Sequence, residues 1–148
     1  MTERSVVVGR DGRAKAYRPI PQADRAVAIL SGVAAYERGD YFEAHEDLEP
    51  AWMGTDDLGE RAYLQGLIKL AAAYVHAVRG NPAGISRNLN GARARLAEAL
   101  ETGGGAAADL TRIDLQALIS EIERRLTDLA DQPNDPSLGP PNLQRTLP

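Results

Sequence analysis

The sequence predicts an all-α protein: a single-domain helical bundle of about five helices, built from antiparallel helical hairpins. Composition is the first reason, because 43% of the 148 residues are hydrophobic but only 5% are aromatic. Alanine and leucine dominate the apolar set, and both favour helix over strand. The second reason is that apolar residues recur every three or four positions in successive segments, separated by short turns that contain glycine or proline. Short turns make consecutive helices antiparallel neighbours.

Residues 1–21 are expected to form a basic N-terminal arm, which precedes a helical bundle domain in residues 22–131. Within the arm, residues 6–8 and 13–17 flank the sequence GRDG at 9–12, a pattern that fits a small hairpin. A loosely packed arm fits the same residues, since two short strands alone are only marginally stable.

The first two helices of the bundle are predicted from their end signals. The first runs over about residues 22–38, with Gly39 as its C-terminal cap. Asp40 begins the second helix, and Glu43 three residues later completes a capping box. Pro50 lies inside this second helix. Because proline lacks a backbone donor and disfavours helical geometry at the preceding residue, a kink or break is expected just before it.

Three further helices complete the predicted bundle. Asp57 and Glu60 form a second capping box, and the helix that they begin reaches about Arg79. The sequence GNP at residues 80–82 closes that helix and opens the next one. The last helix is expected over about residues 114–129, with apolar residues at helical spacing.

Residues 132–148 are expected to form a proline-rich C-terminal tail, because their prolines and glycine exclude a helix. The tail is either free or wrapped across the bundle. Leu138, Leu143 and Leu147 supply apolar side chains at intervals, enough to dock on a groove but not to fold alone.

The segment from Tyr41 to Trp52, YFEAHEDLEPAW, carries the clearest functional signal. On a helix, one face carries five residues of this segment: Tyr41, His45, Leu48, Glu49 and Trp52. A histidine and a carboxylate within an apolar stripe must be hydrogen-bonded internally or must bind something, because burying them unpaired is costly. The candidate pocket comprises the aromatic residues of this segment, the polar pair, and a glutamine of the next helix: Tyr41, Phe42, His45, Glu49, Trp52 and Gln65.

The same segment raises the question of a metal site. The sequence His45-Glu46-x-x-Glu49 is comparable to the zinc-protease signature, with glutamate in place of the second histidine. His45, Glu49 and His76 together have the ligand types that suit zinc or iron. The hairpin geometry opposes this set, because His76 would lie ~12 Å along the helix axis from the residue that faces His45. A hydrogen bond from Gln65 to His45 or Glu49 is better placed.

Three blocks of sequence resemble the bacterial and archaeal family called domain of unknown function 309. They are the residues 41–52, the sequence LQGLIKLAAA at 64–73, and His76 followed by Gly80-Asn81. The resemblance covers roughly residues 25–130. It implies an all-helical fold and an uncharacterised activity. Members are sometimes labelled predicted metal-dependent hydrolases, a label that rests on the histidine and the glutamates.

The sequence therefore favours an uncharacterised, non-enzymatic module that binds a small ligand or a partner, with a buried His–Glu–Gln polar network. The alternative is a metal-dependent hydrolase that uses His45 and Glu49 with His76 or Glu46. No cofactor is predicted under the first interpretation, and zinc or iron belongs to the second. The net charge of −4 argues against nucleic acid and anionic membranes as partners, and the absence of cysteine excludes thiol chemistry. A cytoplasmic, soluble monomer or homodimer is expected.

Overall fold

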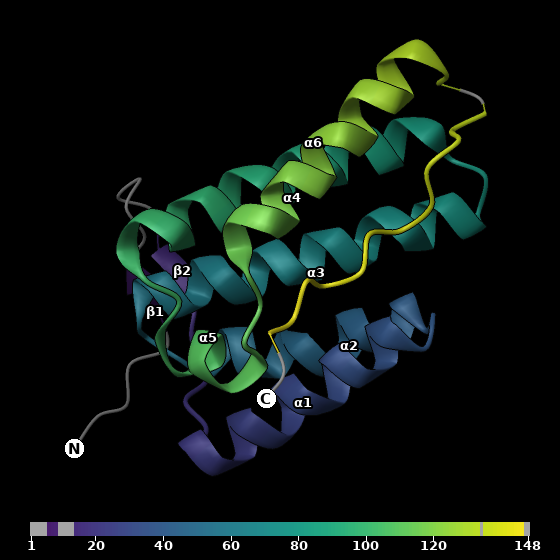
Figure 1. Ribbon diagram of the computed structural model, residues 1–148. Helices are drawn as coiled ribbons and strands as arrows, with labels where there is room; N and C mark the ends of the chain where they lie inside the picture. The colour runs from purple at the N-terminus through teal and green to yellow at the C-terminus, as the bar shows by residue number, and fades with distance from the viewer. Residues whose placement is uncertain (1–5, 9–13, 134, 147–148) are drawn as a thin grey trace.

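The computed structural model describes residues 6–8, 14–133 and 135–146. It confirms the all-α class, with helices packed as a bundle (Figure 1). Within the described residues there are six helices, one more than predicted, because a short helix, α5, follows the glycine-rich segment after α4. The helices are α1 (Gln22–Glu37), α2 (Tyr41–Met53), α3 (Leu58–Val78), α4 (Pro82–Thr102), α5 (Gly105–Thr111) and α6 (Leu115–Asp131).

Two antiparallel hairpins, α1–α2 and α3–α4, form the body of the bundle, as the turn signals predicted. Each turn has a glycine with positive φ, 88° at Gly39 and 69° at Gly80. In both turns the next residue donates its backbone N–H to a carbonyl of the preceding helix, from Asp40 to Ala35 and from Asn81 to His76. Only glycine adopts this conformation without strain, so the two turns are built in the same way.

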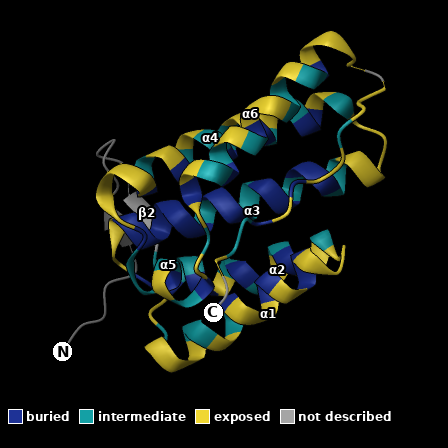
Figure 2. Cartoon of the chain, in the orientation of Figure 1, coloured by how far each residue is buried: buried dark blue, intermediate teal, exposed yellow. Residues whose placement is uncertain are grey.

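Helix α3 lies at the centre of the bundle (Figure 2), and twelve of its 21 residues are buried. It packs against α4 on one side and α2 on the other, while α6 covers α4. The core between these helices is aliphatic: Leu64, Leu70, Leu89, Leu96, Leu118 and Ile122 are each 0% exposed. The face of α2 that is buried against α1 and α3 consists of Ala44, Leu48 and Ala51.

Two local predictions for α2 differ from the structure. Of the kink or break predicted before Pro50, the break is absent, because the helix continues to Met53 with the proline inside it. Burial of Leu48 and Ala51 on either side of the proline holds this segment in place, so tertiary packing outweighs the missing backbone bond. The Asp40 side chain does not cap the helix either. Arg38 binds it instead, at 2.6 Å, together with Glu43, also at 2.6 Å.

The second predicted capping box is half correct. Asp57 caps α3, since its carboxylate accepts a hydrogen bond from the backbone N–H of Glu60 at 2.9 Å. The Glu60 side chain does not reach back to Asp57, however. It is 2% exposed and accepts a hydrogen bond from the backbone N–H of Ala107, which anchors α5 to the start of α3.

Of the two alternatives for the N-terminal arm, the structure has the hairpin. Strands β1 (Val6–Val8) and β2 (Ala14–Ala16) pair antiparallel, with Val7 opposite Lys15. The GRDG loop between them lies outside the described residues. The arm continues along the bundle, where Arg18 donates its backbone N–H to the Met53 carbonyl at 2.8 Å. The first and last predicted bundle residues, 22 and 131, are the first residue of α1 and the last of α6.

The C-terminal tail is wrapped across the bundle, in the space between α6 and the α1–α2 hairpin (Figure 1). Leu143 is 4% exposed, and the buried Tyr36 hydroxyl of α1 donates to the Pro141 carbonyl at 2.7 Å. Further along, Asp114 donates its backbone N–H to the Gln144 carbonyl at 2.9 Å. Leu138 is partly buried, whereas Leu147 lies outside the described residues. The described tail therefore belongs to the folded domain.

Candidate functional site

The predicted pocket residues of α2 do not form one buried stripe. Tyr41 and Trp52 are partly buried against the core, but Phe42 is 60% exposed. Trp52 packs instead against a guanidinium, since Arg61 of α3 lies 4.7 Å above the centre of its ring. Arg61 also donates to the backbone carbonyls of Trp52 at 3.1 Å and Thr55 at 3.0 Å. Trp52 and Arg61 thus fix the loop between α2 and α3, a structural role.

His45, Glu46 and Glu49 form a compact polar cluster on the outer side of α2. The His45 Nδ1 atom lies 3.6 Å from a Glu46 carboxylate oxygen and 3.9 Å from one of Glu49. The three side chains offer ligand atoms within 4.8 Å of one another. Their side chains are 32%, 56% and 46% exposed, so the prediction of a buried network was wrong.

The two predicted partners from α3 do not join this cluster. Among the described residues, Gln65 makes no hydrogen bond to His45 or Glu49, and the group of potential metal ligands does not include His76. His76 lies in the last turn of α3, where its Nδ1 is 3.1 Å from the Asn81 side-chain amide. Its ring packs against the first turn of α4 at Gly84. The metal set His45, Glu49 and His76 remains a prediction. The cluster on α2 has Glu46 in place of His76.

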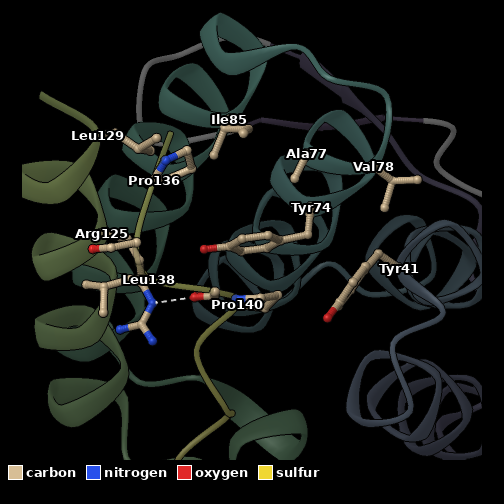
Figure 3. A pocket seen from close by; sticks show the side chains of 12 residues that line it. Tyr41, Tyr74, Ala77, Val78, Ile85, Arg125, Leu129, Pro136, Leu138 and Pro140 are labelled. Carbon is tan, nitrogen blue, oxygen red and sulfur yellow. Dashed lines mark hydrogen bonds between the residues drawn. The ribbon is translucent and has the colours of Figure 1, made fainter. Parts of the chain in front are cut away.

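A different site lies at the other end of α2. A half-open cavity of about 580 Å³ is lined by α2, α3, the start of α4, α6 and the tail (Figure 3). Most of its lining is apolar or aromatic, and the tail forms one wall. The lining residues are Tyr41, Tyr74, Ala77, Val78, Ile85, Arg125, Leu129, Pro136, Ser137, Leu138, Gly139 and Pro140.

Three tyrosines from three helices meet beside this cavity. The rings of Tyr36 and Tyr41 are 5.2 Å apart in an edge-to-face arrangement, and those of Tyr41 and Tyr74 are 5.8 Å apart. Burial disfavours the phenolate and raises the pKa of all three hydroxyls, that of Tyr74 to about 12. The hydroxyls are therefore protonated at neutral pH and can donate hydrogen bonds.

Helix α6 supplies the polar groups that hold the tail wall. Arg125 donates from Nε to the Gly139 carbonyl at 2.9 Å (Figure 3). One turn further, Asp128 accepts three hydrogen bonds from the tail: from the Ser137 backbone and hydroxyl at 2.9 and 2.7 Å, and from the Leu138 backbone at 3.1 Å. These bonds, first of all that from the Ser137 hydroxyl, hold the pKa of the Asp128 carboxyl below its usual value.

Of the predicted pocket residues, only Tyr41 lines this cavity. Sequence analysis missed Tyr74 and Arg125. Tyr74 directly follows the block of residues 64–73 that resembles the family, and it is an aromatic residue on the α3 face that points toward α2. Arg125 carried no such signal, because an arginine on an amphipathic helix normally faces solvent.

Residues 29–88 match the family model described as "Domain of unknown function (DUF309)". The matched residues begin in α1, contain all of α2 and α3, and end in α4. This match confirms the resemblance found in the sequence. Comparisons with curated proteins and with solved structures gave no match. Within the described residues, none of the helices combines the length and the apolar character needed to cross a membrane.

Proposed function

We propose that the protein is a non-enzymatic module that binds a small molecule in the cavity between α2, α3 and α6, with the C-terminal tail as one wall. The observation that carries this proposal is the cavity itself. Its volume of about 580 Å³ falls within the range of about 300–1,000 Å³ that is usual for small-molecule sites. Its lining has the usual composition as well: mostly apolar and aromatic side chains, with a few polar groups that can orient a ligand.

The positions of the lining residues in the sequence support the same proposal. Tyr41, Tyr74 and Ile85 lie within the residues that match the family model, whereas Arg125 and the tail lie outside it. One wall of the site is thus part of the common helical domain, and the other is supplied by the C-terminal part of this chain.

A fragment screen followed by two-dimensional NMR of the full chain tests the proposal. Ligands of this site should shift the signals of Ala77, Ile85 and Leu129. The variant Ala77→Trp, which fills the cavity from the side of α3, should abolish these shifts. Ala97→Trp is the matched control, because Ala97 lies on the exposed face of α4, away from the cavity. A screen in which no fragment produces shifts that Ala77→Trp removes would refute the proposal.

The second candidate function is the metal-dependent hydrolase, and the clustering of His45, Glu46 and Glu49 is the observation that favours it. One imidazole and two carboxylates suit zinc or iron. Such an ion would supply Lewis-acid chemistry, and these three side chains would hold it. Two features fit a catalytic centre poorly: the carboxylates are about half exposed, at 56% and 46%, and neither glutamate lines the 580 Å³ cavity. Metal analysis of untagged protein decides between the two candidates.

A further inference from the structure

We infer that the ligand of the tail-walled cavity is an amphipathic molecule with one carboxylate, whose apolar body lies against the aliphatic lining and whose head group meets Arg125 and the Tyr74 hydroxyl. This inference rests on the proposed function and specifies the ligand's chemical class.

The charge of the lining favours an anion over a cation. Among the described residues that line the cavity, Arg125 is the only charged one, and no carboxylate is present. The remaining polar side chains of the lining are the hydroxyls of Tyr41, Tyr74 and Ser137. Arginine and hydroxyl donors suit a carboxylate, whereas an ammonium group would meet a like charge without a counterion.

The Tyr74 hydroxyl and Arg125 lie at the same end of the cavity. In Figure 3 the Tyr74 ring crosses the cavity from α3, and its hydroxyl points toward Arg125 on α6. Burial raises the pKa of Tyr74, and Arg125 partly offsets that rise through its positive charge and a side-chain hydrogen bond. A protonated hydroxyl and a guanidinium side by side provide two donors for the two oxygens of a carboxylate.

The protein's own carboxylates only partly satisfy Arg125. Glu121 is shared, since it lies 3.2 Å from Arg125 and 2.7 Å from Arg124. Asp128, the next acid along α6, is engaged with the tail through three hydrogen bonds. Within the described part of the chain, the hydrogen bonds of Arg125 use Nε and Nη1. Arg125 also shares a side-chain hydrogen bond with Tyr74, so a carboxylate that approaches the Tyr74 hydroxyl meets the guanidinium as well.

The aliphatic part of the lining comes from α3, α4 and α6: Ala77, Val78, Ile85 and Leu129, of which Ile85 and Leu129 are buried and Val78 is 80% exposed. Figure 3 shows Ile85 and Leu129 together, on the far side of Tyr74 from Pro140. An alkyl or aryl body would be removed from water there at a gain of roughly 25 cal/mol per Å² of apolar surface. One polar end and one aliphatic wall match a molecule with one head and one apolar body.

Three probes with the same body and different heads test this inference on the full chain. Decanoate, decanol and decylamine are titrated below their critical micelle concentrations, and their dissociation constants are measured by NMR from the signals of Ile85 and Leu129. We expect decanoate to bind about tenfold or more tightly than decanol, as a charge-assisted hydrogen bond requires. Decylamine should bind more weakly than decanol.

Two matched arginine variants separate the site from the general charge of α6. Arg125→Gln should remove the preference for decanoate over decanol. Arg124→Gln is the control: it removes the same charge one residue away, but Arg124 is 64% exposed and does not line the cavity. It should leave the preference unchanged. Unfolding midpoints of both variants verify that each one folds.

The outcomes are distinct. Equal binding of decanoate and decanol, or a preference that survives Arg125→Gln, overturns the carboxylate inference while the cavity remains a small-ligand site. Tighter binding of decylamine overturns the charge argument directly. If none of the three probes shifts the signals of Ile85 and Leu129, the inference also fails. The fragment screen described above then decides separately whether the cavity binds small molecules at all.

Discussion

The His45–Glu46–Glu49 cluster and the tail-walled cavity both include residues of α2, yet they are built in opposite ways. The cluster consists of three residues within five positions of one helix, and all three side chains are substantially exposed. The cavity combines residues from Tyr41 to Pro140, and its walls come from four helices and the tail.

This difference affects what each site can do. The charges of an exposed cluster lie in water. Ion pairs contribute little to stability there, and water competes with a ligand for the charged groups. The cavity is partly shielded from solvent, and its polar groups, Tyr74 and Arg125, lie beside apolar surface. Hydrogen bonds and charges act more strongly there. The motif that stands out in the sequence, His45–Glu46–Glu49, is therefore exposed, whereas the larger concave space lies beside the tail.

The largest effect on stability is expected where the tail docks on the bundle beyond the cavity, at Leu143. Leu143 is 4% exposed, and the neighbouring Pro141 accepts the hydrogen bond from Tyr36. Leu143→Ala should therefore lower the free energy of unfolding by about 2–4 kcal/mol, as for other buried leucines. Chemical denaturation measures this change. Asp135→Ala, at an exposed tail position, is the control and should change stability by under about 0.5 kcal/mol. Equal stabilities for Leu143→Ala and the wild type would show that the tail does not dock in solution.

The fold was largely predictable because its signals are local. Glycine at positions 39 and 80, proline at 82, and apolar residues at helical spacing each specify a turn or a helix within a few residues. The short helix α5 was missed for the same reason. Its start is fixed by a remote residue, Glu60, whose buried carboxylate accepts the Ala107 N–H, and nothing near Gly105 indicates this contact.

The candidate site was predictable only in part, again for a physical reason. Helical spacing correctly placed His45 and Glu49 on one face of α2, but it could not tell which face the core would take. The helix buries Ala44, Leu48 and Ala51 instead, because alanines allow close approach to α1 and α3. The contacts of the tail could not be derived from the sequence, because an extended segment has no periodicity that indicates which helices it packs against.

An intermediate effect is expected when the tail's contact with α6 is weakened by acid. The pKa of Asp128 is lowered in the folded protein, chiefly by the hydrogen bond from the Ser137 hydroxyl. A lowered pKa means that this stabilisation is present above the unfolded-state value, about 3.9, and is lost as the pH falls through the lower folded-state value. The Ser137 and Leu138 amide signals should therefore move toward free-peptide positions below about pH 4.

The variant Asp128→Asn tests whether Asp128 itself causes this acid effect. It should give the same displaced Ser137 and Leu138 signals at neutral pH, because an amide oxygen is a weaker acceptor than a carboxylate. Glu123→Gln is the control, since Glu123 lies on the exposed side of α6. If the amide signals of Asp128→Asn stay at their wild-type positions at neutral pH, Asp128 does not hold the tail.

A smaller effect is expected at His76, which the structure places at the end of α3 and apart from the α2 cluster. Its ring lies against Gly84 and its Nδ1 is 3.1 Å from Asn81. His76→Asn should cost under about 1 kcal/mol, the size of a helix-terminal interaction. Thermal unfolding measures the stability, and mass spectrometry measures bound metal in the same samples. A loss of metal in His76→Asn would instead assign His76 to the metal set that the sequence suggested.

The smallest effect on stability is expected at Glu49, and it tests the exposed cluster directly. If Glu49 were buried, its replacement by alanine would leave a hydrogen-bond donor unpaired and would lower the free energy of unfolding by about 1–3 kcal/mol. The structure instead leaves its side chain 46% exposed and 3.9 Å from His45, so Glu49→Ala should cost under about 0.5 kcal/mol. Glu49→Gln should be equally stable. If the protein is a ligand-binding module, neither variant changes its metal content or its affinity for cavity ligands. Stoichiometric zinc or iron in the wild type that Glu49→Gln removes without loss of stability would make the cluster the functional centre, because a neutral amide is a poor ligand for these ions.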